Sequence, residues 1–169
     1  MKKMKKQEKP QEQRQFSLRA IYLREGLQWI SDSFDPSLPG QGLSGQFRIS
    51  GHQMEVQEAI ENVPNAIPIK TFRVTSSFEF RYLNIPEDEQ IDVEDESKHL
   101  VAKISARITV DYLIETPDTP PKEKLEKWAS SNALLHTWPY WREFCHSTLL
   151  RMSLPVIVMP MMDVTTTKE

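Results

Sequence analysis

The 169-residue sequence contains one cysteine, five glycines and no long apolar run. A single cysteine excludes a framework of intramolecular disulfides and is typical of proteins that fold in a reducing compartment. No apolar stretch approaches the ~20 residues that a membrane-spanning helix needs. The basic first residues are not followed by the apolar core of a signal peptide. We therefore expect a cytoplasmic protein without direct membrane insertion.

The net charge of −3 gives no indication of a general nucleic-acid-binding protein. Positive charge gathers in residues 1–14, which hold five lysines and one arginine but no large apolar residue except methionine. This composition predicts a disordered, solvated tail. Docking of the tail on RNA or on acidic surfaces is the less favoured alternative. The rest of the chain suits a single domain over residues 15–162, with a short tail at 163–169.

The motifs of common catalytic sites are also missing. The four histidines are scattered, and there is no glycine-rich phosphate loop, nucleophile elbow or carboxylate pair with a shared role. A Cu(I) site built from Cys145, His146, Met152 and Met159 is conceivable. Flexible packing is the commoner use of methionine, and we favour it. The sequence thus predicts a protein that is not an enzyme and needs no metal or cofactor.

Strict alternation of apolar and polar residues marks two segments, 72–82 and 100–114, whose even positions are apolar or small. This period of two predicts antiparallel strands with one covered and one solvated face. Residues 15–27 and 43–50 predict two further strands; apolar residues of both parities in the first suggest that both its faces are covered. Residues 52–68 are ambiguous and fit one or two helical turns that end at the prolines.

Seven acidic residues and one lysine make up half of the connection at 84–99. A calcium loop would need a glycine turn and regularly spaced oxygen ligands, and neither is present. The favoured interpretation is a solvated hairpin tip. The alternative is an acidic contact surface for a basic partner, which would include Glu87, Asp88 and Glu89.

The stretch from Asn132 to Met162 divides at Ser153. Before that residue an apolar stripe recurs at helical spacing, with Pro139 either starting the helix or kinking it away from a preceding turn. After it comes an uncharged apolar run with two prolines, which has to lie in a groove, an interface or a site for a foreign apolar chain. Four strands followed by helices predict an α+β domain, with an antiparallel sheet covered on one face.

The residues Trp138-Pro-Tyr-Trp-Arg-Glu, then a helix, then Leu154-Pro-Val-Ile-Val-Met-Pro resemble the SecB family of protein-export chaperones. Ala20-Ile-Tyr-Leu-Arg-Glu is similar to that family's first strand. The resemblance implies a homotetramer built as a dimer of dimers. It also implies ATP-independent binding of unfolded precursor polypeptides along apolar grooves. The groove candidates are Trp138, Tyr140, Val156, Ile157, Val158, Met159, Met161 and Met162, some of which would instead fill the core or a subunit interface.

The sequence also departs from the family pattern. Export chaperones of this family engage the SecA motor through an acidic face; Glu25 matches one acidic position there, but Trp29 stands near a second. The usual C-terminal helix has no counterpart in the few residues after Met162. Three functions therefore remain open: an export chaperone that binds SecA, a SecB-like chaperone dedicated to an antitoxin or other single client, and a structural oligomer without chaperone activity.

Overall fold

The computed structural model describes residues 15–38, 42–59, 69–85 and 97–162. It contains four strands and one helix in the order β1 (Phe16–Ile30), β2 (Leu43–Ala59), β3 (Ile69–Asn84), β4 (Leu100–Ile114) and α1 (Lys122–Arg151). The basic tail, the acidic residues Glu87, Asp88 and Glu89, and the tail at 163–169 lie outside these ranges.

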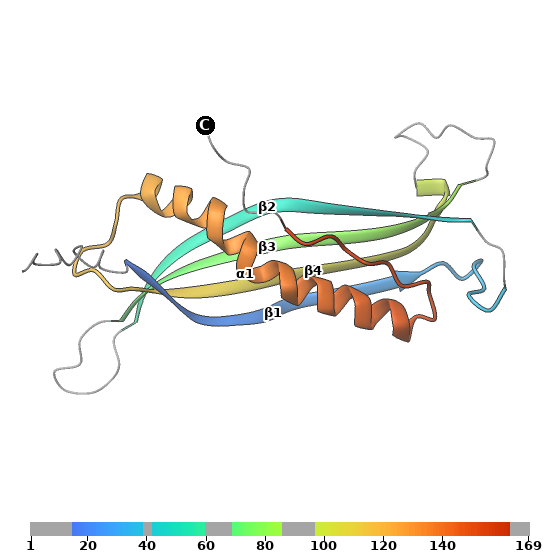
Figure 1. Ribbon diagram of the computed structural model, residues 1–169, viewed down its shortest axis with the longest axis horizontal. Helices are drawn as coiled ribbons and strands as arrows, with labels where there is room; N and C mark the ends of the chain where they lie inside the picture. The colour runs from blue at the N-terminus through green and yellow to red at the C-terminus, as the bar shows by residue number, and fades with distance from the viewer. Residues whose placement is uncertain (1–14, 39–41, 60–68, 86–96, 163–169) are drawn as a thin grey trace, which may run out of the picture.

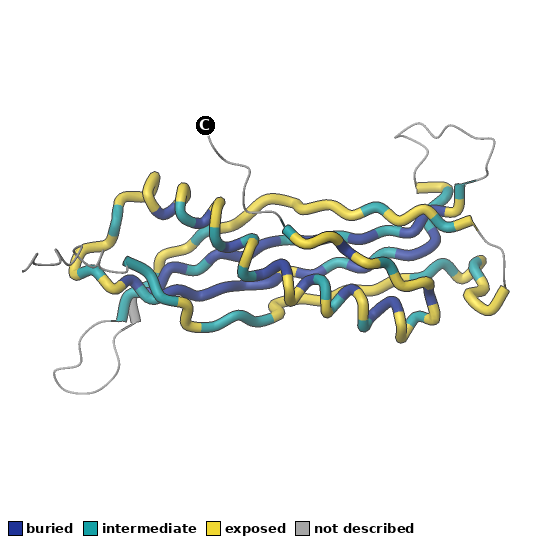
Figure 2. Tube along the Cα trace, in the orientation of Figure 1, coloured by how far each residue is buried: buried dark blue, intermediate teal, exposed yellow. Residues whose placement is uncertain are grey.

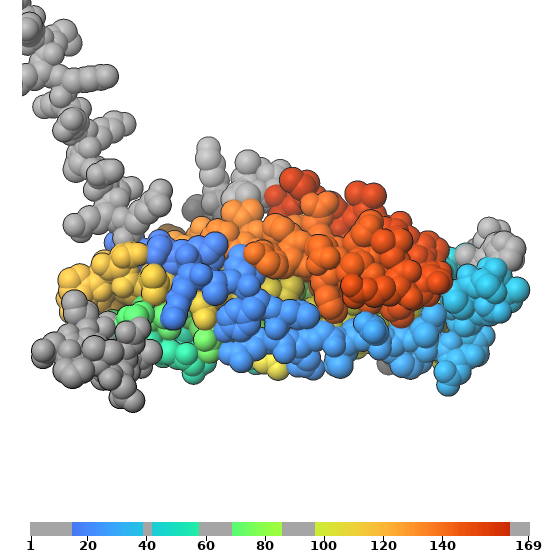
Figure 3. Space-filling view, turned by 90° about the horizontal axis from the view of Figure 1, so that it is seen from below, coloured from blue at the N-terminus to red at the C-terminus, as the bar shows by residue number. Residues whose placement is uncertain are grey.

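The strands form one antiparallel sheet in the order β1-β4-β3-β2, so β4 and β3 are central and β1 and β2 are edges. Helix α1 and the segment that follows it lie on one face of this sheet (Figure 1). Seen from the side, they form a second layer above the strands (Figure 3). The predicted α+β class is confirmed, with a single helix in the covering layer.

Central strands β3 and β4 carry the core. The even positions predicted to face inward are buried, from Phe72 to Tyr82 and from Ala102 to Ile114. Figure 2 shows this burial concentrated along the two central strands. The opposite face is less solvated than predicted, because Thr109 is fully buried and Asp111 is 7% exposed there.

Edge strand β1 changes face twice. Its pairing with β4 shifts register between Leu18 and Ala20 and again between Leu23 and Glu25. Each shift inserts one extra residue, a β-bulge, which reverses the parity of inward-facing positions. The mixed parity in the sequence therefore reflects bulges, and the expectation that both faces are covered is wrong: Leu23 and Leu27 are 47% and 57% exposed.

Edge strand β2 is longer than predicted and continues through residues 52–59, where helical turns had been considered. Its register against β3 shifts between Ile49 and His52, at Gly51, whose φ of 61° favours glycine. Before the shift odd positions face the helix; after it even positions do. The remainder of the ambiguous stretch, 60–68, lies outside the described residues.

Helix α1 runs without interruption through Pro139, so proline neither starts a new helix nor separates two. The predicted stripe faces the sheet: Trp141, Cys145 and Leu149 are fully buried. The ring of Trp141 stacks on Phe78 at a centroid distance of 5.3 Å. Nearer the C-terminus, a Cβ on Gly26 would come within 2.7 Å of Phe144, so glycine there lets α1 approach β1 closely.

Ser153 reverses the chain at the end of α1. It adopts a left-handed conformation with φ of 55°. Its N–H donates to the carbonyl of Leu150, and Leu154 N–H donates to that of Leu149, at 3.2 and 3.0 Å. This is a Schellman motif, and the side chains of Leu149 and Leu154 meet in the same core cluster, as such motifs favour. The motif sends the apolar segment back along the helix.

Candidate apolar groove

The C-terminal segment Leu154–Met162, hereafter the apolar segment, lies beside α1 over the sheet (Figure 1). Two hydrogen bonds to its backbone hold it there. Tyr82, on β3, donates its hydroxyl to the carbonyl of Pro155 at 2.7 Å. Trp138, on α1, donates its indole N–H to the carbonyl of Pro160 at 3.0 Å. The segment is therefore fixed to both layers of the fold near its two ends.

The side chains of the apolar segment divide between core and solvent. Leu154 and Met159 are buried in the main core cluster, while Ile157 and Met162 pack partly against it. Val158 and Met161 are 91% and 80% exposed. Exposed apolar side chains, beside buried ones that anchor the same backbone, form a surface that a second apolar chain can cover.

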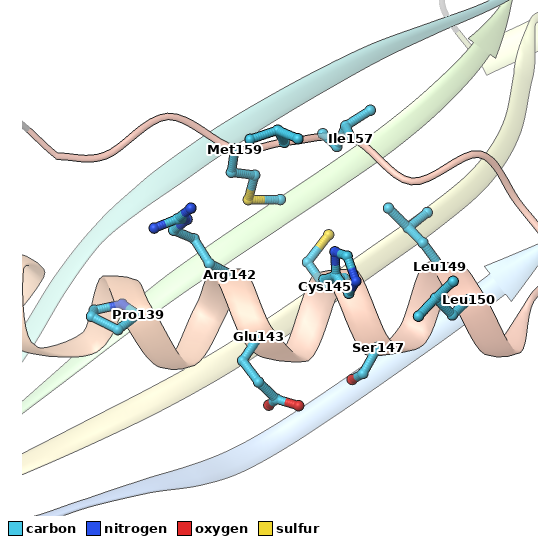
Figure 4. A pocket seen from close by; sticks show the side chains of 11 residues that line it. Pro139, Arg142, Glu143, Cys145, Ser147, Leu149, Leu150, Ile157 and Met159 are labelled. Carbon is cyan, nitrogen blue, oxygen red and sulfur yellow. The ribbon is translucent and has the colours of Figure 1, made fainter.

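A groove of about 510 Å³ separates the apolar segment from α1. One wall is formed by Ile157, Val158 and Met159, and the other by helix positions 139–150. Figure 4 shows Met159 and Cys145 pointing toward each other across its floor, with Leu149 beside them and Glu143 directed away. The floor is thus apolar along its length. A groove of this kind binds by burial of apolar surface rather than by specific hydrogen bonds.

The polar residues that line this groove all belong to the helix, and they are Arg142, Glu143, His146 and Ser147. The guanidinium of Arg142 lies 3.1 Å from the sulfur of Met161, a contact between α1 and the apolar segment. Cys145 is not a reactive centre, because burial raises the pKa of its thiol to about 12. The groove is therefore apolar, with charged residues along its α1 side.

The sequence-predicted groove residues fall into four groups. Ile157, Val158 and Met159 line the groove, and Trp138 supports the segment from the core, at 3% exposure. Val156, Met161 and Met162 belong to the same segment but do not line the groove. Tyr140 is 48% exposed on α1 and does not line the groove. Their role in binding remains a prediction.

Sequence reasoning missed most of the helix wall. Pro139, Arg142, His146 and Leu150 recur at intervals of three or four residues, which places them on one side of α1. That spacing is present in the sequence, but these residues adjoin the buried stripe and are not among the predicted groove residues. Apolar side chains of β2 that remain exposed on the helix-covered face were missed as well, namely Phe47, Ile49 and Val56.

The predicted acidic contact at Glu25 lies elsewhere, on the face of the sheet opposite the helix. Its carboxylate is 3.2 Å from Arg107, and both side chains are about half exposed. Trp29 lies further along β1 on the same face, 49% exposed. An acidic surface is not assembled there by the described residues.

Two histidines are engaged by hydroxyl groups. Nδ1 of His52 lies 2.8 Å from Ser76 Oγ, and Nδ1 of His136 lies 2.8 Å from the Tyr112 hydroxyl. Burial lowers the pKa of both imidazoles. Within the described ranges no group of three or more His, Cys, Asp or Glu residues could hold a metal ion. In the same part of the chain, no helix combines the length and apolarity that crossing a membrane requires.

Comparison with solved structures finds a similar fold. The Mycobacterium tuberculosis SecB-like chaperone Rv1957, solved in complex with a ChAD peptide from the Rv1956 HigA1 antitoxin, matches with a TM-score of 0.60. The match covers 88% of this chain and 91% of that one, at 19% sequence identity. No family model matches the sequence, and no relative is found among curated proteins. The chain therefore has a SecB-like fold, as its motifs predicted.

Proposed function

We propose that this chain of SecB-like fold is a molecular chaperone that holds unfolded segments of other proteins on its apolar groove. The supporting observation is the apolar segment: it is anchored through Leu154 and Met159, yet leaves Val158 and Met161 in solvent. Exposed apolar side chains beside an apolar groove are typical of a site that another chain covers. A non-native polypeptide supplies the apolar side chains that would do so.

The composition of the groove suits clients of many sequences. Methionine has three rotatable bonds and adapts to differently shaped neighbours. Backbone donors and acceptors of a bound chain could stay in contact with water, because the groove is open on one side. Binding of this kind needs no nucleotide, and the sequence offers no glycine-rich loop for one. The proposed chaperone therefore acts by holding its client, without ATP.

A homotetramer, as a dimer of dimers, is part of this proposal. Strand β1 is an edge of the sheet, and its exposed Leu18 and Leu23 face the side that α1 covers. An open edge with apolar neighbours favours pairing with another strand. Association through surfaces away from the groove would leave one groove per subunit open.

Between the two classes of partner, the structure favours a dedicated client over SecA. The similar solved chaperone carries an antitoxin peptide. By contrast, Arg107 puts a positive charge 3.2 Å from Glu25 on the face where the family's acidic contact would lie, and Trp29 stands near the position where the resemblance places a second acid. We propose an antitoxin or another single aggregation-prone protein as the main client. Delivery of secretory precursors to SecA in the cytoplasm is the second candidate, supported by the motif resemblance alone.

Suppression of aggregation tests the proposal. A reduced, unfolded test protein is diluted with and without one subunit equivalent of the chain, and light scattering is followed. The wild type should suppress scattering without added nucleotide, and Val158→Asp together with Met161→Asp should abolish suppression. Val158→Leu is the matched control, because it keeps the site apolar.

Native mass spectrometry of the same samples gives the oligomeric state and its client occupancy. A stable oligomer that neither suppresses aggregation nor retains the unfolded protein would overturn the chaperone proposal. That result would support the structural-oligomer alternative. SecA and antitoxin are then compared as partners in parallel pull-downs.

A further inference from the structure

The face of the sheet opposite α1 contains a second hollow, of about 580 Å³. No layer of the described chain covers this face. Its lining is polar and comes from all four strands: Arg24, Gln53, Met54, Glu55, Arg73, Thr75 and Arg107. Three guanidinium groups and the Glu55 carboxylate line it, and two of these guanidinium groups are bonded to carboxylates beside the hollow, Arg73 to Asp111 and Arg107 to Glu25. An anion would therefore be received mainly by Arg24.

The three arginines differ in how strongly their guanidinium groups are bound to carboxylates of the same chain. Arg73 donates two hydrogen bonds to buried Asp111, at 2.7 and 3.0 Å, and is thereby held in place. Arg107 is 3.2 Å from Glu25 in a pair about half exposed. Surface pairs of this kind contribute little and exchange partners readily.

Arg24 is the most available of the three. Its guanidinium lies 5.3 Å from the centroid of the Tyr22 ring and 3.5 Å from the Tyr22 hydroxyl. No carboxylate of the described residues pairs with it. An incoming carboxylate could therefore accept hydrogen bonds from Arg24 without displacing a strong internal partner.

The charge of the whole face also favours an anionic partner. Among the strand residues whose pairing or ring contact assigns them to this side, six are basic and four acidic, an excess of two positive charges on a chain whose net charge is −3. The basic ones are Arg24, Arg48, Arg73, Arg81, Lys103 and Arg107, and the acidic ones are Glu25, Glu55, Glu79 and Asp111. An acidic partner is complementary to this face. The four carboxylates disfavour the dense phosphates of nucleic acid.

Apolar groups continue the surface along β1. Leu27 and Trp29 follow Glu25 at alternate positions on the same face, 57% and 49% exposed. Alternate residues of a strand are about 7 Å apart, the same repeat as in an extended peptide. A peptide lying along β1 could place an acidic side chain near Arg24 and apolar side chains over Leu27 and Trp29.

We propose that this face is a docking surface for an acidic segment of a partner protein, with apolar residues at alternate positions after its acidic one. Arg24 and Arg107 receive the carboxylates, and Leu27 and Trp29 receive the apolar side chains. The surface is separate from the client groove and lies on the other side of the sheet. It would attach the chain to a partner while the groove stays free for a client.

The test uses fluorescence anisotropy with the full chain and a labelled extended peptide that carries two glutamates followed by two leucines at alternate positions. Arg24→Glu should weaken binding at least ten-fold, while Lys127→Glu, the same charge change on exposed α1, should leave it unchanged. Trp29→Ala should weaken binding of this peptide but not of a version with serines for leucines. Val158→Asp, which alters the client groove, should have no effect.

Equal affinity of wild type and Arg24→Glu, with both proteins folded by circular dichroism, would overturn the proposal. So would loss of binding in Val158→Asp, which would place the peptide in the client groove. Tighter binding of a single-stranded RNA of equal charge would identify a different class of partner and also count against it. Aggregation suppression by Arg24→Glu should match that of the wild type, so failure here leaves the chaperone proposal untouched.

Discussion

The indole N–H of Trp138 donates to the backbone carbonyl of Pro160 at 3.0 Å, which joins the helix to the far end of the apolar segment. The indole ring is buried and lies between strand and segment, 6.0 Å from Phe47 and 6.1 Å from Phe78 by ring centroids. One side chain therefore both fills the core and positions the surface proposed to bind clients.

Replacing Trp138 by Phe should separate these two roles. Phenylalanine keeps most of the apolar contact but cannot donate to Pro160, so we expect a loss of about 1–2 kcal/mol in unfolding free energy. Hydrogen exchange should accelerate in residues 155–162 and remain unchanged in the central strands. Tyr82→Phe, which removes the other tether at Pro155, is the companion variant. Unchanged exchange in both variants would show that the hydrogen bonds do not hold the segment.

Substitutions at Ser153 should act on the chain reversal. Because the residue adopts φ of 55°, Ser153→Gly should stabilise the fold by roughly 1 kcal/mol. Ser153→Val should destabilise it by ~1–2 kcal/mol, since a β-branched side chain tolerates this conformation poorly. Urea denaturation monitored by circular dichroism measures both. The prediction fails if glycine is the less stable of the two.

The two faces of β4 should differ sharply in how well they tolerate substitution. Ile108 is 1% exposed, and a lysine there would bury an unpaired charge, so Ile108→Lys should abolish soluble expression. Arg107, next to it in sequence, is a surface residue, and Arg107→Ala should change unfolding free energy by less than about 0.5 kcal/mol. Soluble yield and a thermal melt provide the comparison. Equal stability of the two variants would contradict the assignment of faces.

Stability should decrease on mild acidification. Burial lowers the pKa of His136, so below the unfolded value of about 6.5 the unfolded chain takes up the proton first. The contribution of the neutral imidazole to the stability of the fold is complete above that pH. It is lost as the pH falls toward the lowered pKa of the folded state. Urea midpoints measured from pH 8 to 5 should show the decrease. His136→Gln should flatten it, and adding His52→Gln should flatten it further, because burial lowers that pKa too.

The sequence predicted the central strands and the helical stripe because nothing interrupts their periods. Phe72–Tyr82 and Leu100–Ile114 pair over long stretches with only one irregularity, so alternate positions stay on one face. The edge strands were less predictable, since the bulge near Gly51 and those near Arg19 and Arg24 reverse parity within one strand. A bulge is decided by pairing with a distant neighbour, and such pairing is not visible in a local pattern.

Prediction of the groove was partial for a similar reason. The composition of the apolar segment predicted a non-helical run, and the end of the stripe predicted that the helix stops at Ser153. Which of its side chains would face the core depended on the reversal angle and on the hydrogen bonds to Tyr82 and Trp138. Buried Met159 beside exposed Val158 is a consequence of that geometry, and hydropathy alone treats the two alike.

Cys145 gives the chain a chemical reporter of its own movement. The sole thiol lies fully buried beneath Met159, and the high pKa leaves almost none of it as thiolate at neutral pH. A maleimide dye can therefore reach it only while the strap formed by residues 154–162 is lifted. The labelling rate of the unmodified protein counts those openings directly, and a ligand that pins the strap down will slow it.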